Sequence, residues 1–359
     1  MLMKDIIIRY LKKNIPYILM VIFLVSVQVF IFVENRSSRP ESETRVTRAD
    51  ETTERFFMFD PDEMKAREEK VRRLAYENPK LYMFLGLVNL SILFALFTGF
   101  ILDIYFSIRI LRKKPVMIRS NRREDPRWSI SDVCKVALIF LSFGYVCAIV
   151  QAVLADKISI LVNENFNMVF NTALMNIVGI SVILYFAVKK YGHRLPDLGL
   201  TGKKMARNVF YAVTGYISLL PVLLVILVIT FVAARMFEYK PPLQPIVKVF
   251  MEEKQTGILW LSAVFAAVFG PVAEEIFFRG FMYPAIKRIT GGIGAVIITS
   301  VIFAALHAHL AGFMPIMALG ILLAYLYEKT GSLASSMAVH IMHNLSMVCL
   351  VFLVRSIGM

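Results

Sequence analysis

The sequence is poor in charge and in cysteine. Charged residues make up 18% of its 359 residues, below the roughly 25% of soluble globular proteins, and there are three cysteines. So few cysteines exclude a disulfide-stapled scaffold, and a hydrophobic fraction of 58% excludes a disordered chain. The net charge of +14 would suit a nucleic-acid binder, but long uncharged apolar runs would not. We therefore expect the lipid bilayer, and no nucleic acid, as the partner of this chain.

Nine apolar runs approach or exceed the roughly 20 helical residues needed to cross a bilayer core of about 30 Å. They predict an all-α fold, a polytopic membrane helical bundle with eight to nine transmembrane helices. The first run follows four basic residues and resembles a signal peptide, but its 19 residues are long for one, so an uncleaved span is preferred. The nine runs are residues 15–33, 81–102, 133–154, 169–188, 209–234, 258–285, 291–311, 314–327 and 333–354.

The positions of the basic residues predict the orientation, because lysine and arginine favour cytoplasmic loops. A cytoplasmic N-terminus places 21 of the 40 basic residues in the cytoplasm. In contrast, residues 34–80 carry 11 basic and 12 acidic residues and would lie on the opposite side. We expect a multi-pass protein of a bacterial plasma membrane with its N-terminus in the cytoplasm.

The chain divides into two predicted domains. Residues 1–127 form an N-terminal extension with two spans, a polar loop at 34–80 and a basic cytoplasmic loop, and residues 128–359 form the core. Within the polar loop, an aspartate N-cap followed by proline predicts a helix over residues 60–76 that stops before the next proline. Two interpretations of this helix stay open, a solvated helix or a partner-binding one.

Several ionisable residues fall at bilayer depth, where they are costly and usually mark function. Glu275 and Arg279 are four residues apart, so on a helix they share a face and can pair. Glu274 is rotated by about 100° from its neighbour and has no local partner, which suits a general base. The alternative is a buried ion pair that only orients helices.

Two further helices carry histidines. Phe303 and His307 lie on one face of the first, and His340 and Asn344 lie on one face of the second. Histidine and asparagine both donate hydrogen bonds to a developing oxyanion. Together with Glu274, these residues combine a base that activates water, an orienting imidazole and an oxyanion site on three membrane helices.

These residues resemble the CAAX protease and bacteriocin-processing family (CPBP or Abi family) of intramembrane proteases. Its motifs E-E-x-x-x-R, F-x-x-x-H and H-x-x-x-N/D occur here in order and without a mismatch. The resemblance is specific between about residues 269 and 345. The matching positions are Glu274, Glu275, Arg279, Phe303, His307, His340 and Asn344.

The resemblance implies peptide-bond hydrolysis inside the membrane by a glutamate-dependent mechanism. Glu274 would activate water with the help of His307, while His340 and Asn344 would stabilise the oxyanion. The remaining two charges of the first motif would hold its geometry as structural support. The implied substrate is a membrane-associated peptide or protein, with or without a lipid attached.

The requirement for a metal and the activity itself have alternatives. There is no H-E-x-x-H, so we expect no required cofactor, but Glu274, His307 and His340 could form an open zinc site of a metalloprotease. One competing function is a non-catalytic membrane scaffold or sensor of the same fold. A less favoured one is an ion-coupled transporter, because buried charges also line translocation paths.

Overall fold

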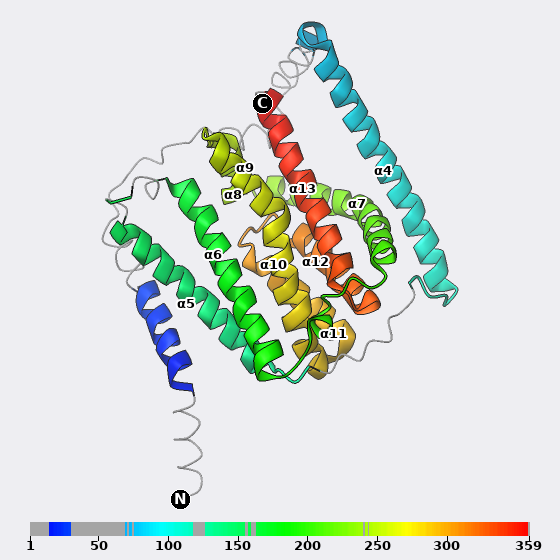
Figure 1. The fold of residues 1–359 in the computed structure, drawn as a ribbon. Coiled ribbons are helices and arrows are strands. Elements are labelled where there is room, and N and C mark those ends of the chain that lie inside the picture. The colour runs from blue at the N-terminus through cyan, green and yellow to red at the C-terminus, as the bar shows by residue number, and fades with distance from the viewer. Residues whose placement is uncertain are drawn as a thin grey trace, which may run out of the picture.

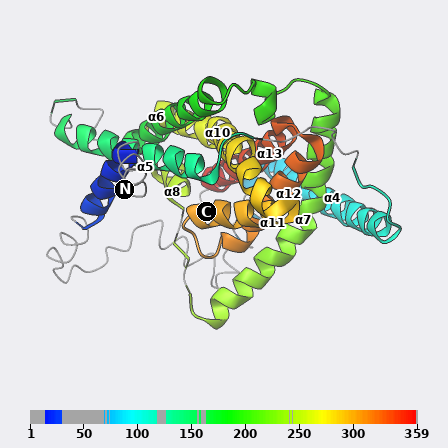
Figure 2. The ribbon, with the colours of Figure 1, turned by 90° about the horizontal axis from the view of Figure 1, so that it is seen from below.

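A bundle of helices makes up the structure, a computed structural model (Figure 1). The part of the chain that it describes contains no strand, which confirms the all-α prediction. Figure 2 shows the same bundle from below, with α4 at one edge and the helix Asn14–Val29 at the opposite edge. The described residues are 14–29, 69, 72–73, 75–117, 126–154, 157–158, 163–239, 241–242 and 244–357.

Seven helices of the described part are long and apolar enough to cross a membrane. One of them, Thr256–Leu306, is 51 residues long and contains two of the predicted spans, which meet where Gly291 adopts φ 73° and ψ 178°. The first predicted span is seen as the shorter apolar helix Asn14–Val29. The seven long helices, with Thr256–Leu306 counted as two spans, and the shorter helix Asn14–Val29 together correspond to the nine predicted runs. The chain is a polytopic integral membrane protein.

The helices and shorter helical segments follow one another along the chain with brief connections. The first half contains α4 (Pro79–Leu111), α5 (Ile130–Leu154), α6 (Glu164–Leu184), the π-helical η2 (Tyr185–Lys190), the 3₁₀ turn η3 (Leu195–Leu198) and α7 (Met205–Met236). The second half contains α8 (Pro245–Glu252), α9 (Thr256–Val264), η4 (Phe265–Phe269), α10 (Gly270–Glu275), η5 (Ile276–Met282), α11 (Tyr283–Leu306), α12 (Phe313–Thr330) and α13 (Leu333–Ile357).

Local sequence signals explain where several helices begin and end. The side chain of Asn78 accepts a hydrogen bond from the Leu81 amide, and Pro79 occupies the first turn of α4. Gly331 ends α12 in the left-handed conformation, which favours glycine because a side chain is strained there. This sharp stop lets α13 begin at Leu333, whose amide donates to the Gly199 carbonyl at 2.9 Å.

Polar contacts tie the helices together at one end of the bundle, which we call the basic end. There the side chains of Lys287 and Glu328 pair at 2.6 Å, and those of Lys190 and Asp132 pair at 2.8 Å. The indole of Trp128 donates to the carbonyl of Phe281 at 2.8 Å. These contacts bring α5, η2, η5, α11 and α12 together around the largest apolar cluster of the core.

At the opposite end, the last helix is anchored to the segment that precedes α9. Arg355 donates to the carbonyls of Phe250 and Glu253, each at 2.7 Å. Asn165, at the start of α6, donates to the Glu253 carboxylate at 2.8 Å. Burial opposes ionisation of Glu253, but this bond and the Gln255 amide outweigh it and lower the pKa of Glu253 below its ordinary value.

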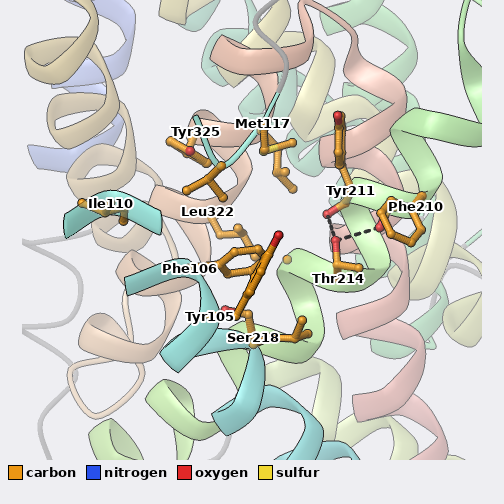
Figure 3. Close-up of a pocket in the computed structure, with 14 residues that line it drawn as sticks. Tyr105, Phe106, Ile110, Met117, Phe210, Tyr211, Thr214, Ser218, Leu322 and Tyr325 are labelled. Atoms are coloured by element: carbon orange, nitrogen blue, oxygen red, sulfur yellow. Dashed lines mark hydrogen bonds between the residues drawn. The ribbon is translucent and has the colours of Figure 1, made fainter. Parts of the chain in front are cut away.

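The N-terminal extension packs on the core through α4 and α7. A Cβ atom at Gly99 would overlap the carbonyl oxygen of Ile217, so only glycine allows this close helix crossing. Pro221 lacks the amide that would bond to that same carbonyl. Beyond this crossing, towards the basic end, α4 and α7 separate and enclose a cavity with α12 (Figure 3).

Most of the predicted helix at 60–76 lies outside the described residues. Within residues 60–78, the structure describes residues 69, 72–73 and 75–77, which are helical, and Asn78, which is not. The stop before Pro79 is therefore confirmed. Within this segment the side chain of Arg73 donates to Glu69 at 3.1 Å, one helical turn away. The division into domains at residue 128 stays a prediction.

Candidate active site

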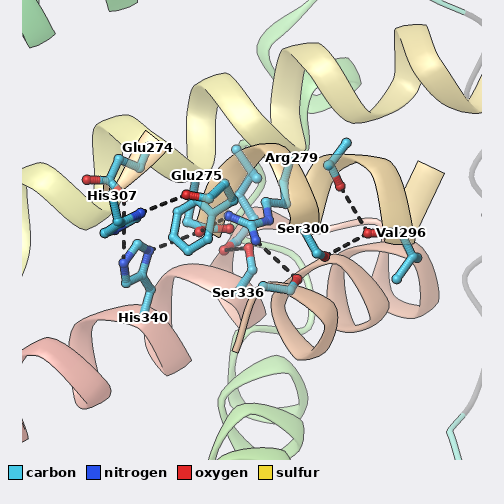
Figure 4. A network of polar contacts seen from close by, with 12 residues as sticks. Glu274, Glu275, Arg279, Val296, Ser300, His307, Ser336 and His340 are labelled. Carbon is cyan, nitrogen blue, oxygen red and sulfur yellow. Dashed lines mark hydrogen bonds and ion pairs between the residues drawn. The ribbon is translucent and has the colours of Figure 1, made fainter. Parts of the chain in front are cut away.

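The three motifs converge from three helices on one region of the bundle (Figure 4). Glu274 and Glu275 end α10, which joins η5 with Arg279. His307 caps the C-terminus of α11, and His340 lies on the second turn of α13. The structure thus brings together residues that are up to 66 positions apart in the sequence.

The base of this site is an ion pair with no exposure to solvent or lipid. Arg279 Nη1 donates to Glu275 Oε1 at 2.7 Å, and both side chains are 0% exposed. Arg279 Nη2 donates to the carbonyl of Gly320 on α12 at 3.1 Å, and the guanidinium lies 4.6 Å from the centre of the Phe303 ring. A buried charge pair is tolerated only with such further partners, and here they link α12 and α11 to the first motif.

His340 connects the two glutamates. Its Nδ1 lies 3.0 Å from Glu275 Oε1, and its Nε2 lies 3.8 Å from Glu274 Oε2. Glu275 therefore orients the imidazole, and the other ring nitrogen faces Glu274. Glu274 Oε2 has no hydrogen-bond partner among the described residues, although the side chain as a whole is 36% exposed. A partly exposed carboxylate with one buried oxygen that lacks a hydrogen bond is suited to accept a proton from water.

His307, an exposed residue, is the second histidine of the site and is drawn with Glu274 and His340 in Figure 4. Its Nδ1 lies 2.7 Å from the carbonyl of Phe303, so Nδ1 carries the proton and Nε2 is left as an acceptor. The Phe303 ring packs between the two imidazoles, 4.7 Å from that of His307 and 5.6 Å from that of His340. The phenylalanine of the second motif therefore fixes the spacing between both histidines.

Asn344 is bound to the backbone of the first-motif helix. Its Nδ2 donates to the carbonyl of Ala266 at 2.9 Å. In η4 the amide of Gly270 donates to the carbonyl of Phe265, five residues earlier. In the same register, the carbonyl of Ala266 would accept a hydrogen bond from the amide of residue 271. That residue is Pro271, which has no N–H, and the asparagine supplies the missing donor. One N–H of the Asn344 amide and its oxygen remain for other partners.

The two glutamates lie between two π-helical segments, η4 and η5. Such segments are rare and occur often at functional sites, because the wider turn changes the direction of the side chains that follow. Here the six residues of α10 between them bring Glu274 and Glu275 to face α13.

The other histidines near the motifs point elsewhere. The ring of His343 packs against Tyr216 on α7, with Nδ1 3.3 Å from the tyrosine hydroxyl. His309 lies 2.8 Å from the carbonyl of Pro242 through Nε2. Within the described residues, no three histidine, cysteine, aspartate or glutamate side chains are arranged to hold a metal ion. The expectation of no required cofactor, and the zinc alternative at Glu274, His307 and His340, both stay predictions.

Sequence reasoning missed Gly320 and the Ala266 carbonyl. A Cβ at Gly320 would lie 3.1 Å from Ser300 Cβ and 3.2 Å from Ser300 Cα, so the glycine allows α11 and α12 to cross closely. That crossing brings the Gly320 carbonyl within reach of Arg279. The only sequence signal was a glycine in the middle of an apolar span, which is typical of close helix packing.

The similarity of this chain to known proteins lies in the region that contains the three motifs. The model of the family "Type II CAAX prenyl endopeptidase Rce1-like" matches residues 256–346. A protein of Bacillus subtilis (strain 168), "Putative membrane peptidase YdiL", is 33% identical over 84 residues, which are 23% of this chain and 34% of that protein. The chain thus spans about a third of the length of this relative. No solved structure matches significantly.

The matched region begins at α9 and ends after the third motif, so it contains the whole candidate site. The resemblance expected from the three motifs is confirmed there. Residues 256–346 are similar to the CAAX prenyl endopeptidase family in the region that holds all three motifs.

Proposed function

We propose that this protein is an intramembrane endopeptidase that hydrolyses a peptide bond of a membrane-associated peptide or protein. The observation that carries the proposal is the partly exposed carboxylate of Glu274, whose buried Oε2 faces His340 without a hydrogen bond, next to the buried pair of Glu275 and Arg279. A purely structural ion pair explains Glu275 and Arg279 but gives no reason for a second carboxylate beside it.

In the proposed reaction, a water molecule lies between Glu274 and the acceptor nitrogen of His307. Glu274 takes a proton from this water as the hydroxide oxygen bonds to the peptide carbonyl carbon. His340 donates through Nε2 to the resulting oxyanion, together with the remaining N–H of Asn344. When the C–N bond breaks, the proton held by Glu274 passes to the leaving amine, and the carboxylate is regenerated.

The scheme gives Glu275 and Arg279 a supporting role. The hydrogen bond between His340 Nδ1 and Glu275 Oε1 fixes the ring with its Nε2 towards Glu274. Arg279 in turn holds the Glu275 carboxylate in place. All steps are assigned to side chains of this chain, and none needs a metal ion.

The proposal is tested with substrates of two kinds. Purified wild type, Glu274→Gln and the matched control Glu252→Gln, an exposed glutamate at the end of α8, are reconstituted with membrane-anchored peptides. Each peptide is made with and without a C-terminal prenyl group, because the matching family is described as prenyl endopeptidases. We expect cleavage by wild type and Glu252→Gln, and a loss of at least about 10³-fold in Glu274→Gln. Equal cleavage by Glu274→Gln would refute the assignment.

The natural substrate is sought in cells. Peptide termini of the membrane fraction are compared between cells that produce wild type and cells that produce Glu274→Gln. A terminus found only with wild type identifies the cleaved bond. An unchanged cellular phenotype after replacing both His307 and His340 would instead favour the scaffold or sensor. Ion flux in liposomes that disappears with Glu274→Gln would favour a transporter.

We also propose that the basic end faces the cytoplasm of a bacterium, with the protein in the plasma membrane. The asymmetry of lysine and arginine supports this orientation. Tags at both termini, probed with protease in spheroplasts, test it. Digestion of an N-terminal tag in intact spheroplasts would show the opposite orientation.

A further inference from the structure

A second cavity lies apart from the candidate active site, between α4, α7 and α12 (Figure 3). Its volume of about 400 Å³ is within the range of small-molecule sites. Most of its wall is apolar, with the hydroxyl groups of Tyr105, Tyr211, Thr214 and Ser218 among the lining residues. The wall combines the N-terminal extension with α12, whose opposite face supplies the Gly320 carbonyl to Arg279.

Two arginines flank this cavity at the basic end. Arg109 lies one turn after Tyr105 on α4, donates to the hydroxyl of Tyr105 at 2.9 Å, and stacks over that ring at 5.7 Å. Arg207 lies one turn before Tyr211 on α7 and stacks over its ring at 5.8 Å. Because α4 and α7 run in opposite directions, both arginines lie beyond their tyrosines on the same side (Figure 1).

Neither arginine has its hydrogen-bonding capacity filled. The Nε atoms of Arg109 and Arg207 are both buried and without an acceptor among the described residues. The nearby carboxylate of Asp103 accepts instead from Ser218 at 2.5 Å. Asp103 is six residues before Arg109, or about 9 Å further into the bundle along α4. Two arginines with an unfilled Nε donor are thus each in contact with a tyrosine that lines the apolar cavity.

An occupant that satisfies this arrangement needs both an apolar chain and an anionic headgroup with several acceptor oxygens. A guanidinium binds phosphate oxygens in a planar, charge-assisted geometry. Basic pockets between membrane helices on the cytoplasmic side are known to bind anionic lipid headgroups. We propose that this cavity binds one acyl chain of an anionic membrane phospholipid, whose phosphate is held between Arg109 and Arg207.

The test measures lipid binding and does not depend on peptidase activity. Delipidated full-length protein in detergent is titrated with phosphatidylglycerol, phosphatidylcholine or inorganic phosphate, and the melting temperature is followed. The test variant is Arg109→Gln with Arg207→Gln. The matched control is Lys114→Gln with Lys203→Gln, which removes two charges from the same end without touching the cavity lining. Thr214→Phe fills the cavity and keeps both arginines.

We expect stabilisation of wild type and of the lysine control by phosphatidylglycerol, and not by phosphatidylcholine or inorganic phosphate. The apparent affinity should fall at least about tenfold in the double arginine variant and in Thr214→Phe, since each loses one half of the site. Equal response to phosphatidylcholine, or an equal loss in the lysine control, would show unspecific lipid association and overturn the proposal. The same shift with inorganic phosphate would show a phosphate site without a chain and would also overturn it. If the double arginine variant does not fold, Thr214→Phe still tests the proposal. Unchanged affinity of this variant for phosphatidylglycerol would refute it.

Discussion

The side chain of Asn344 should contribute to stability through the backbone carbonyl that Pro271 leaves without a donor. Asn344→Ala removes the 2.9 Å hydrogen bond to Ala266 and leaves that carbonyl unsatisfied between membrane helices. Measured side-chain hydrogen bonds in membrane proteins average about 0.6 kcal/mol and reach about 1.7 kcal/mol. A buried acceptor that loses its partner costs about 1–3 kcal/mol. We therefore expect Asn344→Ala to lower the free energy of unfolding by about 1–2 kcal/mol.

A second substitution makes this expectation specific. Pro271→Ala restores an N–H five residues after Ala266, in the register that Gly270 and Phe265 already use. In that background the carbonyl has its own backbone donor, so Asn344→Ala should cost about 1 kcal/mol less than it does with proline present. The difference is the coupling free energy of a double-mutant cycle.

The four proteins of this cycle are unfolded with sodium dodecyl sulfate in mixed micelles, and helix loss is followed by circular dichroism. Ser181→Ala serves as the control, because its hydroxyl donates to the Ile177 carbonyl within its own helix. Peptidase activity is measured on the same samples. Restored stability with activity still lost would assign Asn344 to the oxyanion, whereas joint recovery would make it a positioning residue.

The outcome that refutes the reasoning is additivity. If Asn344→Ala costs the same with proline and with alanine at 271, to within about 0.5 kcal/mol, then the asparagine does not replace the missing amide. The hydrogen bond to Ala266 would then be incidental to the kink in the first-motif helix.

Three further predictions concern two contacts next to the site and one at the far end of the last helix. Arg279→Met should destabilise the protein by about 3–5 kcal/mol, because Glu275 is left buried and charged, and adding Glu275→Met should recover most of this loss in the same unfolding assay. Gly320→Ala should cost about 1–3 kcal/mol through overlap with Ser300, and Ser300→Gly should relieve it; an unchanged midpoint would disprove the close crossing. The lowered pKa of Glu253 means that its ionised form is favoured by folding, so its contribution is complete above the ordinary pKa near 4.5 and is lost as pH falls through the lower folded value. The melting temperatures of wild type and Glu253→Gln should therefore differ at pH 7 and converge at acidic pH, and a constant difference would contradict the shift.

The sequence was sufficient for the number of helices, the three motifs and the pairing of Glu275 with Arg279, because these depend on local spacing. It was not sufficient for the depth of His307. At 1.5 Å per residue, His307 lies about 24 Å along its helix from Gly291, whereas His340 is only about 10 Å from Leu333. Both helices begin at the basic end, so straight parallel helices would separate the two rings. Figures 1 and 2 show that α11 instead runs obliquely, which brings His307 down to the level of His340.

Local spacing does not give the packing between helices, and this also explains why the partner of Asn344 was missed. Helical spacing correctly placed Asn344 one turn from His340, and the proline at position 271 has no N–H to give to the hydrogen-bond ladder of its helix. Which carbonyl the proline frees depends on whether the turn before it is α-helical or π-helical, and that choice comes from packing between helices rather than from local sequence. Because η4 is π-helical, the freed carbonyl is Ala266, and it faces α13. The proline of the first motif region and the asparagine of the third are thus joined by one hydrogen bond, which sets the distance between the helix that carries Glu274 and the helix that carries His340.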